Sequence, residues 1–111
     1  MECIFCKIIN KEISSETIYQ DDKILAIQDI EPKAPVHLLI IPKKHIPSIN
    51  YLRKEDRELI GELCLIAQKI AKKYKISGSG YRLVFNIGRD AGQTVDHLHL
   101  HLLGGKKLLW A

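Results

Sequence analysis

The chain has 111 residues, of which 46% are hydrophobic and 27% are charged. This composition excludes a disordered, collagen-like or coiled-coil chain and suits one compact domain, expected to span residues 1–111. The formal charge of +4 and the isoelectric point near 9.0 favour an anionic ligand such as a phosphate.

Partners and compartment follow from charge, hydropathy and cysteine number. The lysine pairs are scattered, so no nucleic-acid partner is predicted, and no apolar run approaches the ~20 residues that span a bilayer. The first ten residues, MECIFCKIIN, lack the basic start and small-residue cleavage site of a signal peptide. Three cysteines without an export signal favour reduced thiols in the cytoplasm over a disulfide framework.

The first half of the chain predicts a short helix and three strands. Residues 3–10 place Ile4, Phe5, Ile8 and Ile9 at helical spacing. Residues 16–20 and 23–30 are typical of two strands joined at Asp21-Asp22. Residues 36–42 are nearly all apolar, which predicts a third strand at the centre of a sheet.

The second half predicts one long helix and two more strands. The helix covers residues 54–75, and its buried stripe contains Leu59, Leu63, Cys64, Ile66, Ile70 and Tyr74. Residues 81–88 and 95–105 are expected to be strands, and 89–94 a polar loop between them. These elements predict an α+β fold with a five-stranded, mostly antiparallel sheet, one long helix and a short N-terminal helix.

The stretch HLHLHLL, residues 97–103, places three histidines at alternate positions. Because alternate side chains of a strand point to opposite faces, His97, His99 and His101 share one face and the leucines share the other. The histidine face could be merely the solvated side of a half-exposed strand. It could also ligate zinc, or one imidazole could act as a nucleophile with the others supporting it.

Two further motifs contain residue types that bind ligands or metals. In the loop before the histidines, Gly92 lets the backbone approach a ligand, and Gln93 and Thr94 add neutral donors, which suits a phosphoryl group. Near the N-terminus, Cys3 and Cys6 have the spacing of half a tetrahedral zinc site. The same spacing also fits a redox pair or two small apolar residues on a helix.

The combination of motifs resembles a known family. HLHLHLL fits the histidine triad pattern, and the similarity continues in IFCKIINKEI, DIEPKAPVHLLIIPKKHI, VFNIG, AGQTVDHLHLHLLGG and Trp110. The chain thus resembles the nucleotide-binding, phosphoramidate-hydrolysing branch of the histidine triad (HIT) family, with the N-terminal cysteine pair of bacterial members. The resemblance implies a HIT-like homodimer that hydrolyses purine nucleoside phosphoramidates and binds purine nucleotides such as AMP or GMP.

The resemblance also implies roles for individual residues. His99 matches the nucleophile that holds a nucleotidyl group covalently, and His101 and His37 match the supporting histidines. Asp29 matches the ribose contact and Ile30 the base pocket, while Asn86, Gly92, Gln93 and Thr94 match the phosphate and leaving-group contacts. Cys3, Cys6, His45 and His97 match a structural zinc site, and the chemistry itself needs no metal.

Three other functions remain open on sequence alone. One is a zinc-dependent hydrolase with its metal on the histidine strand. Another is a nucleotide-binding regulatory module with little turnover. The last is a nucleic-acid-binding zinc module, which would need a basic face around the cysteines, where only Lys7 and Lys11 lie near in sequence.

Overall fold

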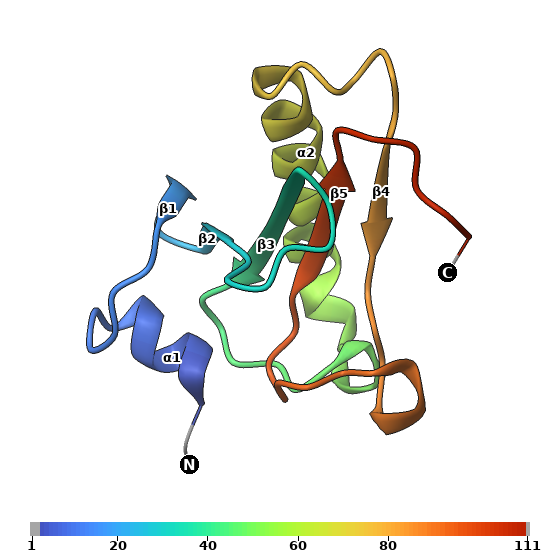
Figure 1. The fold of residues 1–111 in the computed structure, drawn as a ribbon. Coiled ribbons are helices and arrows are strands. Elements are labelled where there is room, and N and C mark those ends of the chain that lie inside the picture. Colours follow the sequence, from blue (N-terminus) through green and yellow to red (C-terminus); the bar gives the residue numbers. More distant parts are fainter. Residues whose placement is uncertain (1–2, 111) are drawn as a thin grey trace.

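The chain folds around one antiparallel sheet. A computed structural model describes residues 3–110, and its five strands lie in the order β1-β2-β3-β5-β4, with every neighbouring pair antiparallel (Figure 1). The strands are β1 (Thr17–Gln20), β2 (Ile24–Gln28), β3 (Val36–Pro42), β4 (Tyr81–Val84) and β5 (Leu100–Gly104). The predicted fold class and the central position of β3 are confirmed.

Two α-helices cover opposite faces of this sheet. The short helix α1 (Ile4–Ile9) packs on one face, and the long helix α2 (Arg57–Lys73) packs on the other (Figure 1). Residues 3–110 also contain three 3-10 turns: η1 (Ile49–Tyr51), η2 (Lys54–Asp56) and η3 (Arg89–Ala91). Within residues 3–110, no helix is both long and apolar enough to cross a membrane.

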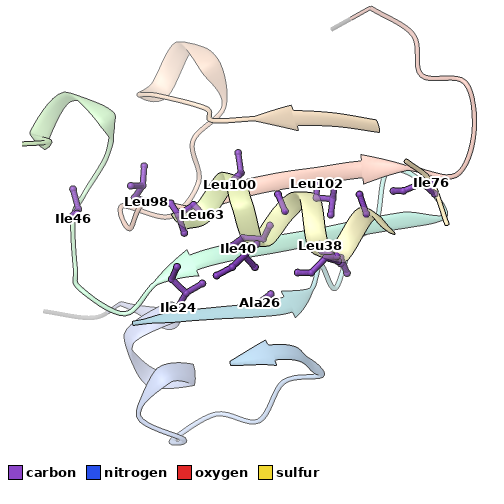
Figure 2. Close-up of a cluster of buried hydrophobic side chains, with 14 residues drawn as sticks. Ile24, Ala26, Leu38, Ile40, Ile46, Leu63, Ile76, Leu98, Leu100 and Leu102 are labelled. Carbon is purple, nitrogen blue, oxygen red and sulfur yellow. The ribbon is translucent and has the colours of Figure 1, made fainter. Parts of the chain in front are cut away.

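The strands β2 and β3 are buried on both faces, which explains their nearly continuous apolar sequences. Leu38 and Ile40 of β3 meet Leu63 of α2 in the larger core (Figure 2). The alternate residues Leu39 and Ile41 belong to the smaller core beneath α1. A single strand therefore supplies side chains to both layers.

The pairing of β3 with β5 fixes which face carries the histidines. Leu102 pairs with Leu38 and lies in the core against α2, whereas His101 pairs with Leu39 and faces the α1 side. Leu98 and Leu100 join Leu102 in the larger core (Figure 2). The predicted division into a leucine face and a histidine face is confirmed.

The long helix differs from its prediction at its start and along one edge. Residues 54–56 form the 3-10 turn η2, and the α-helix begins at Arg57. Cys64, assigned to the buried stripe, is exposed. It lies about 100° around the helix from the fully buried Leu63, at the edge of the arc that contacts the sheet.

Both C-terminal strands are shorter than predicted. β4 stops at Val84, and a loop with glycines at positive φ follows, at Gly88 (83°) and Gly92 (86°). The ladder of β5 begins only at Leu100, opposite Ile40. Pro42, two residues further along β3, has no N–H with which to extend that ladder, so His97 and His99 lie just outside the regular strand.

Candidate functional site

A hollow of about 830 Å³ opens at the C-terminal end of the histidine stretch. Its walls come from the β2–β3 loop, β3, β4, the loop after β4, β5 and the C-terminal tail. Its volume lies within the range of small-molecule sites, roughly 300–1,000 Å³. Seven of the residues predicted for the nucleotide site line it together: Asp29, His37, Asn86, Gly92, Thr94, His99 and His101.

A chain of hydrogen bonds assigns the protons of two of its histidines. The backbone N–H of Lys33 donates to Nδ1 of His37 at 3.0 Å, so the proton of His37 resides on Nε2. That Nε2 lies 3.0 Å from Nδ1 of His101 and 3.3 Å from Oδ2 of Asp29. His101 therefore accepts at Nδ1 and carries its own proton on Nε2, on the ring edge away from His37.

The hydrogen bond of His99 gives this ring the opposite arrangement. Nδ1 of His99 lies 2.7 Å from the backbone carbonyl of His97, to which it donates its proton. Nε2 of the neutral ring then keeps a free lone pair, and His99 lines the hollow. An imidazole held in this way is a nucleophile, because its lone pair is available without loss of a proton.

Burial keeps these three rings neutral near pH 7. It lowers the pKa of His99, and a hydrogen bond to the His97 carbonyl only partly opposes this effect. Burial also lowers the pKa of His37, although the carboxylate of Asp29 acts in the other direction. Burial and the neighbouring rings of His99 and His37 lower the pKa of His101 to about 4.

Phe5 was not predicted as a site residue, yet it covers the histidine face. Its ring stands edge-on to His99, with centroids 5.0 Å apart and planes at 75°, and edge-on to His97 at 5.8 Å. As a result His97 is 0% exposed and His99 8% exposed, so the histidine face is not a solvated one. The apolar periodicity of residues 3–10 predicted a short helix with Phe5 among its apolar residues, but no sequence signal identified the partner of Phe5.

Two residues that the resemblance places in the nucleotide site lie apart from the hollow's lining. Ile30 is 92% exposed beside Asp29, on the β2–β3 loop. Gln93 directs its side-chain amide to three backbone groups of neighbouring segments, those of Pro47, Val95 and Gly88. The neighbours of Gln93, Gly92 and Thr94, do line the hollow.

A second cluster lies beyond His99, where α1 meets the sheet. One ligand-type atom from each of Cys3, Cys6, His45 and His97 lies within 4.8 Å of every other, so the four can hold a metal ion. Sγ of Cys3 is 3.3 Å from Nδ1 of His97, and Sγ of Cys6 is 3.4 Å from Nδ1 of His45. The two Nδ1 atoms are 3.0 Å apart.

The chemistry of these four donor atoms fits a cation with tetrahedral coordination. Two thiol sulfurs and two imidazole nitrogens form a Cys2His2 set, whose atoms would stand roughly 3.3–3.8 Å apart around zinc at its usual bond lengths. Nε2 of His97 lies 2.8 Å from the carbonyl oxygen of Pro42 and donates to it, so Nδ1 turns a bare lone pair toward the cluster. A fixed outer hydrogen bond of this kind is typical of a metal-ligating histidine.

Fold and site together define a class of protein. It is an antiparallel α+β protein in which a neutral histidine with an unprotonated Nε2, a second imidazole N–H and a polar loop surround a hollow of small-molecule size. A family model described as "Scavenger mRNA decapping enzyme C-term binding" matches residues 2–108. The purine nucleoside phosphoramidase of Escherichia coli strain K12 is 48% identical over 107 residues, 96% of this chain and 90% of that protein.

Solved structures agree. A HIT family hydrolase from Legionella pneumophila superposes with a TM-score of 0.96 at 50% identity, covering 98% of this chain and 97% of its own. A histidine triad protein from Clostridium difficile gives a TM-score of 0.95 at 43% identity, covering 100% and 96%. The chain belongs to the histidine triad family, as its sequence motifs predicted.

Proposed function

We propose that this chain hydrolyses purine nucleoside phosphoramidates through a nucleotidyl group held covalently on His99. The observation that carries the proposal is the hydrogen bond from His99 Nδ1 to the His97 carbonyl, which leaves Nε2 unprotonated in the hollow. The 48% identity to a protein named purine nucleoside phosphoramidase supports the same reaction.

In the first half of the reaction, His99 displaces the amine. Its Nε2 lone pair forms a bond to the α-phosphorus as the P–N bond of the substrate breaks. The amine departs with that electron pair and gains one proton taken up from bulk solvent. The Thr94 hydroxyl, which lines the hollow, relays it by giving one proton to the amine and taking one from the solvent side. The Nε2–H of His101 stabilises the negative charge on the phosphoryl oxygens.

In the second half, water replaces His99 on phosphorus. The water loses a proton as its oxygen bonds to phosphorus, and the imidazole leaves with its electrons, which releases the nucleoside monophosphate. A displacement with a poor leaving group thus becomes two steps through an imidazole intermediate. No metal takes part in either step.

Other residues of the hollow orient the nucleotide. Asp29 offers a carboxylate to the ribose hydroxyls, and its Oδ1 is already fixed at 2.8 Å from the N–H of Glu31. Ile30 presents an exposed apolar side chain beside it for the base. Asn86, Gly92, Gln93 and Thr94 belong to the loop that borders the phosphate, with Asn86, Gly92 and Thr94 lining the hollow directly.

Zinc is the metal we propose for Cys3, Cys6, His45 and His97. The support is the Cys2His2 composition of the cluster and the outer hydrogen bond from His97 to Pro42. Zinc would supply a structural crosslink there, joining α1 to the segments that carry His45 and His97. Because the ligands must be thiolates, we propose that the protein works in a reducing compartment such as the cytoplasm.

A homodimer is also proposed. β4 is an edge strand of the sheet, and Leu83 on it is 39% exposed. The tail adds Leu109 and Trp110, which are 87% and 91% exposed. A second copy of the chain would cover this apolar edge and pair its free backbone groups. Analytical ultracentrifugation at micromolar concentration tests the proposal, and a monomer there would contradict it.

The reaction is tested with adenosine 5′-phosphoramidate, with and without a chelator, together with mass spectrometry of rapidly quenched protein. We expect turnover that the chelator leaves intact and an adenylyl mass on the 97–103 peptide. His99→Ala should lose both, with turnover down at least about a thousandfold. Gln68→Ala, on the exposed side of α2, is the control that should keep both.

The same experiment separates the competing functions. Asp29, His37 and His101 also lie within 4.8 Å of one another, so a zinc hydrolase would place its metal there. That mechanism predicts turnover that stops with the chelator and no adduct. Tight AMP binding with no turnover in wild type would instead identify a regulatory module.

A further inference from the structure

The side chain of Gln93 is bonded at every polar position to backbone groups of other residues. Its Nε2 donates to the carbonyl oxygens of Pro47 at 2.8 Å and Val95 at 3.0 Å. Its Oε1 accepts from the N–H of Gly88 at 2.8 Å. One half-buried amide therefore bonds two residues of its own loop, Gly88 and Val95, and joins that loop to the distant segment at Pro47.

The bond to Gly88 closes the loop that walls the hollow. The backbone N–H of Gln93 also donates to the carbonyl of Gly88 at 3.1 Å, so the two residues bond reciprocally across the loop. Between them lie η3 and Gly92, and Gly92 lines the hollow with His99. The shape of this wall depends on the position of the Gln93 amide.

The other two bonds lead to the metal cluster. Pro47 follows the cluster residue His45 by two positions, and Val95 precedes the cluster residue His97 by two. A backbone hydrogen bond joins the same two segments nearby, because the N–H of Leu98 donates to the carbonyl of Ile46 at 2.7 Å. A metal ion that restricts the positions of His45 and His97 would therefore also restrict the carbonyl groups of Pro47 and Val95, which orient the Gln93 amide.

We propose that Gln93 is a positioning residue that couples the metal cluster to the nucleotide site. The coupling rests on the proposed function, because it requires both zinc at the cluster and a nucleotide in the hollow. Binding at the cluster restricts the Pro47 and Val95 carbonyls, these hold the amide, and the amide holds the 88–93 loop in its binding shape. Since coupling between two sites is reciprocal, the nucleotide tightens zinc binding by the factor by which zinc tightens nucleotide binding.

Two variants of Gln93 separate its links. Gln93→Glu keeps an oxygen to accept from Gly88 but lacks the N–H groups that bond Pro47 and Val95, so it removes the link to the cluster and spares the loop closure. Gln93→Met has a similar length and lacks all three bonds. Gln68→Met makes the matched change on the exposed side of α2.

The measurements are two affinities, each with and without the other ligand. Calorimetry gives the AMP dissociation constant of zinc-loaded and metal-depleted protein, and competition with a chromophoric chelator gives the zinc affinity with and without saturating AMP. In wild type and Gln68→Met, we expect each ligand to tighten the other by roughly 5- to 50-fold. In both Gln93 variants this factor should fall to about one, although each still binds zinc.

A second measurement applies if metal-depleted protein loses its fold, as seen by circular dichroism. In zinc-loaded proteins, amide hydrogen exchange of residues 88–94 should be fastest in Gln93→Met, which lacks the loop closure, intermediate in Gln93→Glu, and unchanged from wild type in Gln68→Met. Equal exchange in all four proteins, or equal coupling in wild type and the Gln93 variants, would overturn the proposal. If wild type binds zinc and AMP independently of each other, the coupling is refuted and the proposed function stands. If wild type binds neither ligand, the proposed function is refuted as well.

Discussion

Replacing Phe5 with alanine tests whether α1 supports the histidine face. Phe5 is 6% exposed, and its ring touches His97 and His99 edge-on. Removing a buried phenylalanine ring costs about 3–5 kcal/mol, because the lost contacts leave a cavity that the neighbours fill only in part. We expect the zinc-loaded variant to lose that much free energy of unfolding, with a Tm lower by more than about 10 °C.

The assay is urea unfolding of zinc-loaded protein, followed by circular dichroism. Ile4→Ala, on the same helix, is the control, since Ile4 is 46% exposed and its truncation should cost under about 1 kcal/mol. If the free energies of unfolding of the two variants differed by less than about 1 kcal/mol, the ring of Phe5 would not be what anchors α1. The support that Phe5 is inferred to give His99 would then be refuted.

Three further predictions concern acid stability, packing and the metal. The pKa of His101 is about 4 in the folded chain and 6.5 in its reference state, so the unfolded chain binds more protons between these values. The free energy of unfolding should therefore fall by up to about 3 kcal/mol as the pH drops from 6.5 to 4, and His101→Gln should remove this part of the slope in pH-dependent urea titrations. Gly104→Ala should lose about 1–3 kcal/mol in thermal unfolding, because its Cβ would lie 2.8 Å from Cδ1 of Ile76. Gly61→Ala, with nothing within 4 Å, should gain about 0.5–1 kcal/mol, and a loss there would contradict the packing. Cys6→Ser should release its zinc to a chelator that leaves wild type loaded, as measured by metal analysis, and equal retention would exclude Cys6 as a ligand.

Local sequence patterns predicted the sheet because, within residues 3–110, no tertiary contact overrides the apolar periodicity of its strands. The unbroken apolar run of β3 reflects burial on two faces, and period-2 alternation correctly separated Leu98, Leu100 and Leu102 from the histidines. Prolines and glycines placed the turns, and the family motifs named seven of the residues that line the hollow. These features depend on near neighbours in the sequence or on a pattern shared across the family.

What the sequence did not predict depends on contacts between distant segments. Cys64 looks apolar and periodic, but the sheet contacts only a limited arc of α2 and leaves it exposed. His99 is buried because Phe5, 94 positions earlier, packs against it. The amide of Gln93 was assigned to phosphate by its motif, whereas it bonds Gly88 and Val95 in its own loop and the distant Pro47, a contact that no local pattern predicts.

Two adjacent histidines on one face use opposite ring nitrogens, and this difference divides their roles. His97 donates from Nε2 to Pro42 and turns Nδ1 to the cysteines, whereas His99 donates from Nδ1 to the carbonyl of His97 and turns Nε2 to the hollow. The backbone of the proposed metal ligand thereby fixes the tautomer of the proposed nucleophile. The peptide carbonyl of His97 therefore ties the position of the His99 lone pair to the backbone of the proposed metal cluster, because that carbonyl receives the other proton of the ring.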